Sequence, residues 1–238
     1  EMSASLVGSE MCIRDRWLLP RDCHTVFTLG NKGAMLVVAD GMGGLEAGEI
    51  ASRIAVDTMK EFFSADKITD EIVKDASTIR KYMYEAVVAA DNAIKRKSRE
   101  EKSVKSMGTT LVAAWLFDGY ANIIWCGDSR GYLFNPVSGL AQVTKDHSYV
   151  QELVDSGRLL PEYAFDHPDN NIITRSLGNP QKAANPDFVR LPLQEGEVIL
   201  LCTDGLNSML RDEEIEAVMQ ETSNEIDTCT KALIQGAL

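Results

Sequence analysis

Residues 36–52 read LVVADGMGGLEAGEIAS and change from one local structure to another within a few positions. The apolar run predicts a short strand over Ala34–Ala39. Beyond the loop, apolar residues recur at the 3.6-residue spacing of a helix with one buried face, formed by Ile50, Ile54, Met59 and Phe62. The sequence therefore places Asp40-Gly41 where a buried strand ends and a helix begins.

A second segment near the other end of the chain repeats this design. Residues 198–205 read VILLCTDG, and the apolar run Glu197–Thr203 predicts a buried strand before Asp204-Gly205. A carboxylate at a strand end has a rigid mount, and the following glycine allows a tight turn in which its carbonyl can face an ion. Hard cations prefer such oxygen ligands. Asp40, the Gly41 carbonyl and Asp204 are therefore candidate ligands for Mg²⁺ or Mn²⁺.

The alternative interpretation is structural, because Asp-Gly is first of all a turn sequence. Asp118-Gly119 illustrates it: this pair lies between two runs of β-formers, residues 109–117 and 121–126, and predicts only a hairpin. Asp128, within residues 126–130 (CGDSR), also has turn composition. Spacing alone leaves both interpretations open for Asp40, Asp128 and Asp204.

The rest of the pattern predicts an α+β fold. Strands joined by short turns must pair antiparallel, and the predicted helices cluster early and late around a central run of strands. The expected elements are a helix at about Thr69–Lys97, a hairpin of Gly131–Phe134 with Leu140–Thr144, a helix at His147–Ser156, a polar stretch without period at Leu159–Pro186, and helices at Asp212–Glu221 and Ser223–Gln235.

Composition narrows the class of protein. The chain has 36 acidic and 24 basic residues among 238, a net charge of -12, which argues against nucleic acid or an anionic membrane surface as partner. No apolar run approaches the roughly 20 residues that span a bilayer. The five cysteines are odd in number and form no C-x-x-C pair, which favours reduced thiols in the cytoplasm. His24, His147 and His167 lack the spacing of a zinc site and are expected to be structural.

The order and wording of these segments resemble the metal-dependent protein serine/threonine phosphatases, the protein phosphatase 2C type, in their bacterial form. Residues 37–52 and 200–210 (LLCTDGLNSML) resemble the two metal-binding segments of that family. The central strands and the flap of the family are resembled by residues 107–116 (MGTTLVAAWL), 125–134 (WCGDSRGYLF), 144–159 (TKDHSYVQELVDSGRL) and 167–180 (HPDNNIITRSLGNP). The match runs in order from Val37 to Leu210.

The resemblance implies a four-layer α-β-β-α sandwich of two antiparallel sheets flanked by helices, with two metal ions at one end. Asp40 would bridge both ions, the Gly41 carbonyl would bind one of them and Asp204 the other, and Asp128 would hold a third, looser ion. Asp40 and Asp204 would thereby be the catalytic residues. The cofactors would be Mn²⁺ or Mg²⁺, two ions and in some states three.

The function implied is hydrolysis of phosphoserine and phosphothreonine in proteins, with a serine/threonine kinase as the counterpart enzyme in a bacterial cytoplasm. A water shared by two cations loses a proton near neutral pH and can attack phosphorus in line, so no covalent intermediate is needed. Ser129 and the cysteines therefore receive no nucleophilic role. Two alternatives stay open: a catalytically impaired binding or regulatory module of the same fold, and a phosphatase for small phosphoesters.

Both ends of the chain depart from the family pattern. The family opens with Arg and then Asn-Glu-Asp, whereas residues 17–22 read WLLPRD, which puts Trp17 at the arginine position and leaves Arg16 or Arg21 as weak substitutes. It also ends with a Gly-rich turn carrying an Asp-Asn ligand, and the sequence stops at Leu238 before one. We therefore expect residues 17–238 to be a phosphatase domain that lacks its C-terminal end.

Residues 1–16, EMSASLVGSEMCIRDR, show neither periodicity nor capping residues. Their second part resembles translated sequencing-adaptor sequence. We expect this segment to be a non-native leader that packs poorly and adds no strand to either sheet.

Overall fold

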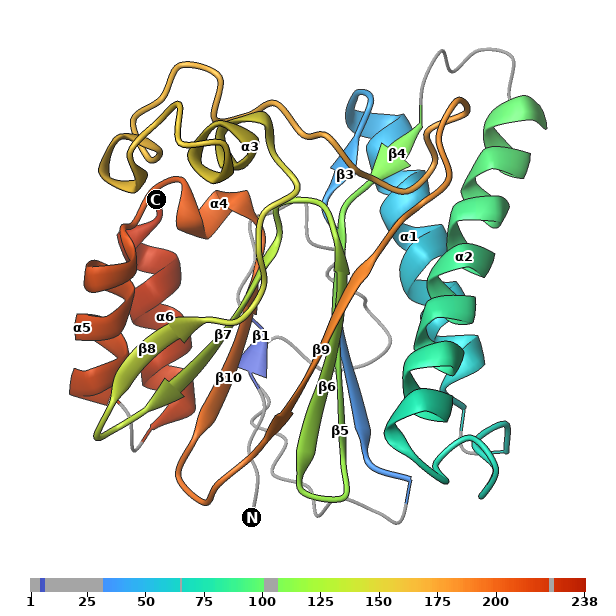
Figure 1. Cartoon of the computed structure of the whole chain (residues 1–238), viewed down its shortest axis with the longest axis horizontal. Helices are drawn as coiled ribbons and strands as arrows, with labels where there is room; N and C mark the ends of the chain where they lie inside the picture. Colours follow the sequence, from blue (N-terminus) through green and yellow to red (C-terminus); the bar gives the residue numbers. More distant parts are fainter. Residues whose placement is uncertain (1–4, 7–31, 65, 101–106, 223–224) are drawn as a thin grey trace.

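The computed structural model describes residues 5–6, 32–64, 66–100, 107–222 and 225–238. Two four-stranded sheets face each other, and a pair of helices covers the outer face of each (Figure 1). Helices α1 (Leu45–Phe62) and α2 (Ala76–Glu100) cover one sheet, and α5 (Asp212–Thr222) and α6 (Ile226–Gly236) cover the other. The predicted four-layer α-β-β-α sandwich is confirmed.

The first sheet is antiparallel throughout, in the order β2 (Ala34–Val38), β5 (Leu111–Phe117), β6 (Tyr120–Cys126), β9 (Asp187–Pro192). Side chains along β5 alternate between its two faces, so Ala113 and Trp115 pack among the helices while Val112 and Ala114 pack against the facing sheet. The predicted hairpin at Asp118-Gly119 is confirmed, because both residues have positive φ, 50° and 74°, as a two-residue turn of this kind requires.

The second sheet has the order β1 (Ser5–Leu6), β10 (Val198–Cys202), β7 (Arg130–Asn135), β8 (Gly139–Gln142). Strand β1 pairs parallel with Leu200 and Leu201 of β10, so the prediction that residues 1–16 add no strand is wrong. An edge strand offers unpaired backbone groups that any short extended segment can satisfy without sequence periodicity. The other residues of that segment lie outside the described residues, and its origin stays a prediction.

Two further elements differ from expectation. Helix α2 begins at Ala76 instead of Thr69, because the Asp75 carboxylate accepts hydrogen bonds from the backbone N–H groups of Ser77 (2.8 Å) and Thr78 (2.9 Å) and so fixes the helix start. Strand β9 was not predicted, since an edge strand that is only half-buried needs no apolar run. The other strands and helices that were predicted begin and end within about three residues of the predicted positions. Four short elements were not predicted: the strands Gly41–Met42 and Gly108–Thr109, the helix Asp204–Asn207 and the 3₁₀ turn Pro161–Tyr163.

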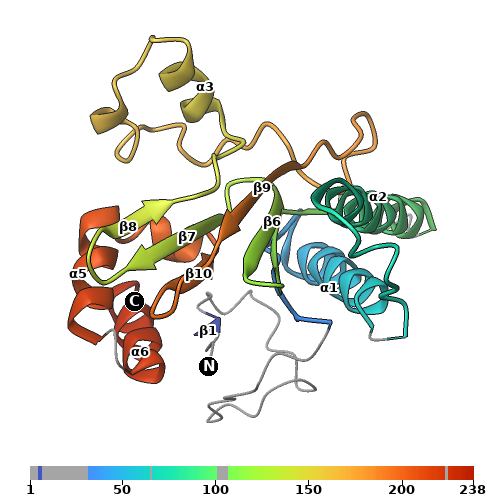
Figure 2. The ribbon, with the colours of Figure 1, turned by 60° about the horizontal axis from the view of Figure 1, so that its bottom comes forward.

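A flap stands off the sandwich between β8 and β9 (Figures 1 and 2). It contains α3 (Tyr149–Asp155), capped by the Ser148 hydroxyl, and the 3₁₀ turn Pro161–Tyr163. Among the helices described, none is long and apolar enough to cross a membrane.

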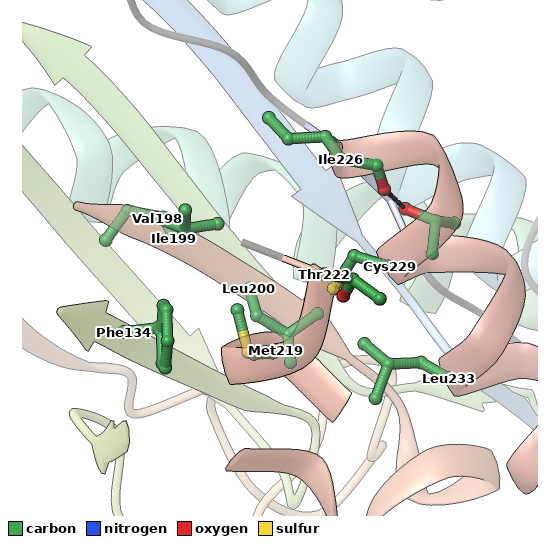
Figure 3. Close-up of a pocket in the computed structure, with 10 residues that line it drawn as sticks. Phe134, Val198, Ile199, Leu200, Met219, Thr222, Ile226, Cys229 and Leu233 are labelled. Atoms are coloured by element: carbon green, nitrogen blue, oxygen red, sulfur yellow. Dashed lines mark hydrogen bonds between the residues drawn. The ribbon is translucent and has the colours of Figure 1, made fainter. Parts of the chain in front are cut away.

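An apolar cleft lies on the helix-covered face of the second sheet, between β10 and helices α5 and α6. Leu200, Met219 and Leu233 point toward one another there (Figure 3). Its free space is about 20 Å³. That volume holds one water at most, so the cleft is a packing gap and not a ligand site.

Candidate metal centre

Three carboxyl groups lie at one end of the sandwich. Asp40, Asp128 and Asp204 each lie two residues beyond the end of a strand, β2, β6 and β10 respectively. Strands β2 and β6 both run antiparallel to β5, so they terminate at the same end of the first sheet. Strand β10 of the facing sheet reaches the same end through α4 (Asp204–Asn207) (Figure 1). The fold thus brings together aspartates that lie up to 164 positions apart, 204 minus 40.

The three carboxyl groups act on one another electrostatically. Asp204 raises the pKa of Asp40 both through its charge and through a side-chain interaction. Burial, then the charge of Asp204, and further the charge of Asp128, raise the pKa of Asp40 to about 7. Burial, followed by the charges of Asp204 and Asp146, raises the pKa of Asp128 to about 7. Like charges held this close disfavour ionisation unless a cation offsets them.

Around any single point, the described residues supply too few candidate ligands to complete a metal site. Over the part of the chain that the structure describes, no group of three or more His, Cys, Asp or Glu side chains is arranged to hold a metal ion. Asp40 and Asp204 form the close pair, and Asp128 acts on both from nearby. The hydroxyl of Thr203 is buried and has no hydrogen-bond partner among the described residues, although it is near enough to lower the pKa of Asp40 slightly. These hard oxygen donors fit Mg²⁺ or Mn²⁺, with further ligands still required.

The two Asp-Gly pairs do not form the expected tight turns. Gly41 lies in the short strand β3 (Gly41–Met42), which pairs with β4 (Gly108–Thr109), and Asp204 opens helix α4. Neither Gly41 nor Gly205 has a positive φ. Gly41 is required for another reason: a Cβ there would collide with the backbone carbonyl of Gly48 in α1, and a Cβ on Gly48 would lie 2.6 Å from the Gly41 oxygen. The metal-binding role of the Gly41 carbonyl stays a prediction.

Two threonines hold the backbone of Asp40 in place. Thr109 donates from Oγ1 to the Asp40 carbonyl (2.8 Å), and Thr110 Oγ1 accepts from the Asp40 N–H (3.0 Å). The same hydroxyl also forms a hydrogen bond with Ser129 Oγ, 2.7 Å away, in which either oxygen can donate. Thr110 therefore joins the segments that carry Asp40 and Asp128. Sequence reasoning missed this function, and the one available signal was a pair of threonines directly before an apolar strand.

Replacing Thr110 by Val is expected to destabilise the protein by about 1–3 kcal/mol, because the new side chain keeps the shape of threonine but leaves the buried Asp40 N–H without an acceptor. Urea unfolding measures this change. Thr110→Ser keeps the hydroxyl and serves as the matched control. Equal unfolding midpoints for the two variants would contradict the role assigned to this hydroxyl.

Arg130 and His147 hold chain segments that flank the site. The Arg130 guanidinium donates to both carboxylate oxygens of Asp146, at 2.8–3.1 Å, which orients the chain as it enters the flap. His147 accepts on Nδ1 from the Gly127 N–H (3.1 Å), so its proton is on Nε2, facing the Asp187 carboxylate at 3.2 Å. Burial lowers the pKa of His147 and keeps it neutral. The structural role predicted for this histidine agrees with these contacts. His167 accepts on Nδ1 from the Asp169 N–H, and His24 lies outside the described residues.

A comparison with known protein families identifies the family of this sequence. The sequence model of the protein phosphatase 2C family matches residues 14–235. The chain belongs to this family. It is therefore a metal-dependent protein serine/threonine phosphatase, and the predicted resemblance is confirmed.

Two similar proteins of this family come from bacteria. The serine/threonine phosphatase stp of Listeria monocytogenes is 38% identical over 196 residues, which cover 82% of this chain and 75% of that protein. The phosphatase PhpP of Streptococcus pneumoniae is 35% identical over 78% of this chain and 72% of its own length.

Solved structures of the family share the fold. A crystal structure of the Mycobacterium tuberculosis phosphatase PstP superposes with a TM-score of 0.75 at 32% identity, covering 90% of this chain and 88% of that one. A further structure of the PstP catalytic domain, with a TM-score of 0.72 and 31% identity over 90% of this chain and 87% of that one, contains two manganese ions.

Proposed function

We propose that this phosphatase hydrolyses phosphoserine and phosphothreonine in proteins, using two Mn²⁺ or Mg²⁺ ions held by Asp40, the Gly41 carbonyl and Asp204, with Asp128 at a third, looser ion. The observation that supports this proposal is the convergence of Asp40, Asp128 and Asp204, which the strand ends of two facing sheets bring to one end of the sandwich. The two manganese ions in the similar PstP structure lend it further support.

Divalent cations at such a site lower the pKa of water and offset negative charge on phosphoryl oxygens. The protein's own groups prepare for that chemistry. Thr109 and Thr110 fix the backbone of Asp40 so that its carboxylate keeps one direction. A carboxyl must lose its proton before it can ligate a cation, so protons and metal ions compete at Asp40, whose pKa is raised to about 7.

Among the described residues near the site, Ser129, Cys126 and Cys202 are poor candidates for a nucleophile. Ser129 Oγ is buried and hydrogen-bonded to Thr110. Burial raises the pKa of Cys126 and of Cys202 to about 12, so both stay as unreactive thiols. These three side chains receive no nucleophilic role, and the proposal assigns the attack on phosphorus to water.

The partners proposed are phosphorylated proteins, with a serine/threonine kinase supplying the phosphate groups. Cys126, Cys202 and Cys229 are free thiols, which agrees with a reducing cytoplasm as the place of action.

The direct test is phosphate release from phosphothreonine and phosphoserine peptides with Mn²⁺, with Mg²⁺ and with EDTA. We expect release that depends on Mn²⁺ and stops in EDTA. Release that persists in EDTA would refute the metal mechanism.

The same experiment examines the alternative of an impaired module. Among the residues that the structure describes, no three His, Cys, Asp or Glu side chains are arranged to hold a metal ion, which favours that alternative. The alternative predicts Mn²⁺ binding, measurable by calorimetry, with no phosphate release. A phosphatase for small phosphoesters would instead hydrolyse p-nitrophenyl phosphate and leave both peptides intact.

A further inference from the structure

One charged side chain lies on the buried face of α2. The other buried residues of this helix are apolar, among them Met83, Val87 and Ile94, and Asp91 is the exception. A carboxylate that is removed from water destabilises the fold unless hydrogen-bond donors surround it. The proposed chemistry does not use this carboxylate, so the donors around it indicate what it does.

Both oxygens of the Asp91 carboxylate accept hydrogen bonds from the loop 178–184, which lies between the flap and β9 and reaches α2 (Figure 1). Oδ1 accepts from the Gly178 N–H (2.8 Å), and Oδ2 accepts from the Ala184 N–H (3.2 Å). The first and last residues of the loop are therefore bound to one carboxylate.

Lys95, one turn further along α2, adds a third attachment to the same loop. Its Nζ donates to Asp91 Oδ2 and to the Lys182 carbonyl, both at 2.7 Å. The side chains of Lys95 and Asp91 are only 13% and 4% exposed, so water screens this ion pair less than a surface pair. No residue of the loop 178–184 lies in a helix or strand, so these side-chain contacts determine much of its position.

Gly178 lets the loop lie close against its neighbours. Its φ is 87°, and a Cβ there would lie 2.4 Å from the Met107 carbonyl oxygen and 2.6 Å from Ile94 Cγ2. Closely packed groups of this kind transmit a displacement from one to the next. A shift of Gly178 would therefore also shift the backbone at residues 107–108.

The residue before the loop contacts the backbone of the candidate metal site. Leu177 and Thr109 exchange two backbone hydrogen bonds, at 2.9 and 3.1 Å. The Asp40 carbonyl accepts from Thr109 Oγ1 and from the Thr110 N–H, both at 2.8 Å. A continuous set of contacts thus joins Asp91 to the backbone of Asp40.

We infer that Asp91 is a positioning residue for the proposed reaction. It holds both ends of the loop 178–184 and so fixes Leu177 against Thr109. Thr109 in turn fixes the backbone from which the Asp40 carboxylate projects. Metal ligands have to be held to within about 0.5 Å, so a loosened loop should weaken metal binding although no ligand is lost. This inference rests on the proposed function, and its first test is independent of catalysis.

The first test replaces Asp91 by Asn and measures amide hydrogen exchange by NMR in EDTA. Asn has the same shape but only one acceptor oxygen. Two donors, the Ala184 N–H and the Lys95 ammonium, favour that oxygen at the Oδ2 position. The NH₂ group of the new side chain then faces the Gly178 N–H, donor against donor, and releases the end of the loop next to Leu177.

We expect the amides of Leu177, Thr109 and Thr110 to exchange about tenfold faster in Asp91→Asn than in the parent, because local opening governs their protection. Asp91→Ala removes both acceptor oxygens and should give a larger increase. The amide of Ile123, in the central strand β6, reports global unfolding and should keep its rate.

Glu85→Gln is the matched control, since it also converts a carboxylate of α2 to an amide, at a side chain that is 54% exposed. It should leave every exchange rate unchanged. Calorimetry should show Mn²⁺ binding that is about tenfold weaker in Asp91→Asn and unchanged in Glu85→Gln. If Asp91 acts through Thr109, adding Thr109→Val to Asp91→Asn should weaken Mn²⁺ binding by less than the product of the two single effects.

The outcomes separate this inference from the proposed function. Selectively faster exchange together with weaker Mn²⁺ binding supports the positioning role even if no peptide is hydrolysed, and the proposed function alone then fails. Exchange at Thr109 and Thr110 that is unchanged in both Asp91 variants, or that rises only in proportion to Ile123, would overturn the inference. Equal Mn²⁺ affinities of Asp91→Asn and Glu85→Gln would overturn it as well, while peptide hydrolysis by both would sustain the phosphatase.

Discussion

Replacing Asp40 by Asn is expected to lower Mn²⁺-dependent phosphate release by about a thousandfold or more. Asn keeps the size of the side chain but loses the charge that would bridge two cations, and about 4 kcal/mol of transition-state stabilisation corresponds to this factor. The backbone contacts from Thr109 and Thr110 do not involve the side chain, so the fold should persist. Initial rates on a phosphothreonine peptide give the measurement.

The chain supplies its own matched control for this substitution. Asp118 also precedes a glycine, but it lies in the β5–β6 turn with φ of 50°, a conformation that Asn adopts readily. Asp118→Asn should therefore retain full activity. If Asp40→Asn and Asp118→Asn behave alike, the assignment of Asp40 as a ligand is wrong.

The second large effect concerns pH and the metal-free protein. Burial and neighbouring carboxylates raise the pKa values of Asp40 and Asp128 from 3.8 to about 7. A carboxyl whose pKa is higher in the folded state than in the unfolded state favours folding most below pH 3.8, and that contribution is lost as the pH rises through 7. The melting temperature without metal should therefore fall by about 5–10 °C between pH 5 and pH 8.

Mn²⁺ should reverse this trend, because protons and cations compete for the same oxygens. We expect the ion to raise the melting temperature more at pH 8 than at pH 5, measured by differential scanning calorimetry with and without EDTA. Asp40→Asn removes one of the titrating groups and should flatten the pH dependence, whereas Asp118→Asn should not. A metal-free protein whose melting temperature is constant over this range would show that the carboxyls do not repel as described.

The elements with strong local signals were predictable from the sequence. The β5–β6 hairpin follows from two runs of β-formers around Asp118-Gly119, and α5 follows from its apolar period. Helix α2 began later than expected because a single side chain, Asp75, ends the preceding turn. Strand β9 has no local signal of its own, since its pairing with β6 fixes its position.

The candidate site also combines residues that the sequence identifies with residues whose role depends on the tertiary fold. The resemblance singled out Asp40, Asp128 and Asp204, and the strand directions bring all three to one end. The need for glycine at 41 could not be predicted, because it comes from Gly48, seven positions away in a different element. Thr110 and Asp91 act through contacts 70 and 87 positions distant, to Asp40 and Gly178. Such partners are set by the tertiary fold and leave no local pattern.

Asp40 and Asp204 follow strands of different sheets, so metal binding would also depend on how the two sheets are assembled. Each half of the sandwich would carry only part of the proposed ligand set, so neither sheet alone would hold the ions. A slip of one residue in the register of β2 or β10 would turn the strand's inward side chains outward and move its aspartate away from the other. Metal uptake would then report that both sheets have assembled in the correct register. The same ions would fasten the two sheets together at the end where the chemistry takes place.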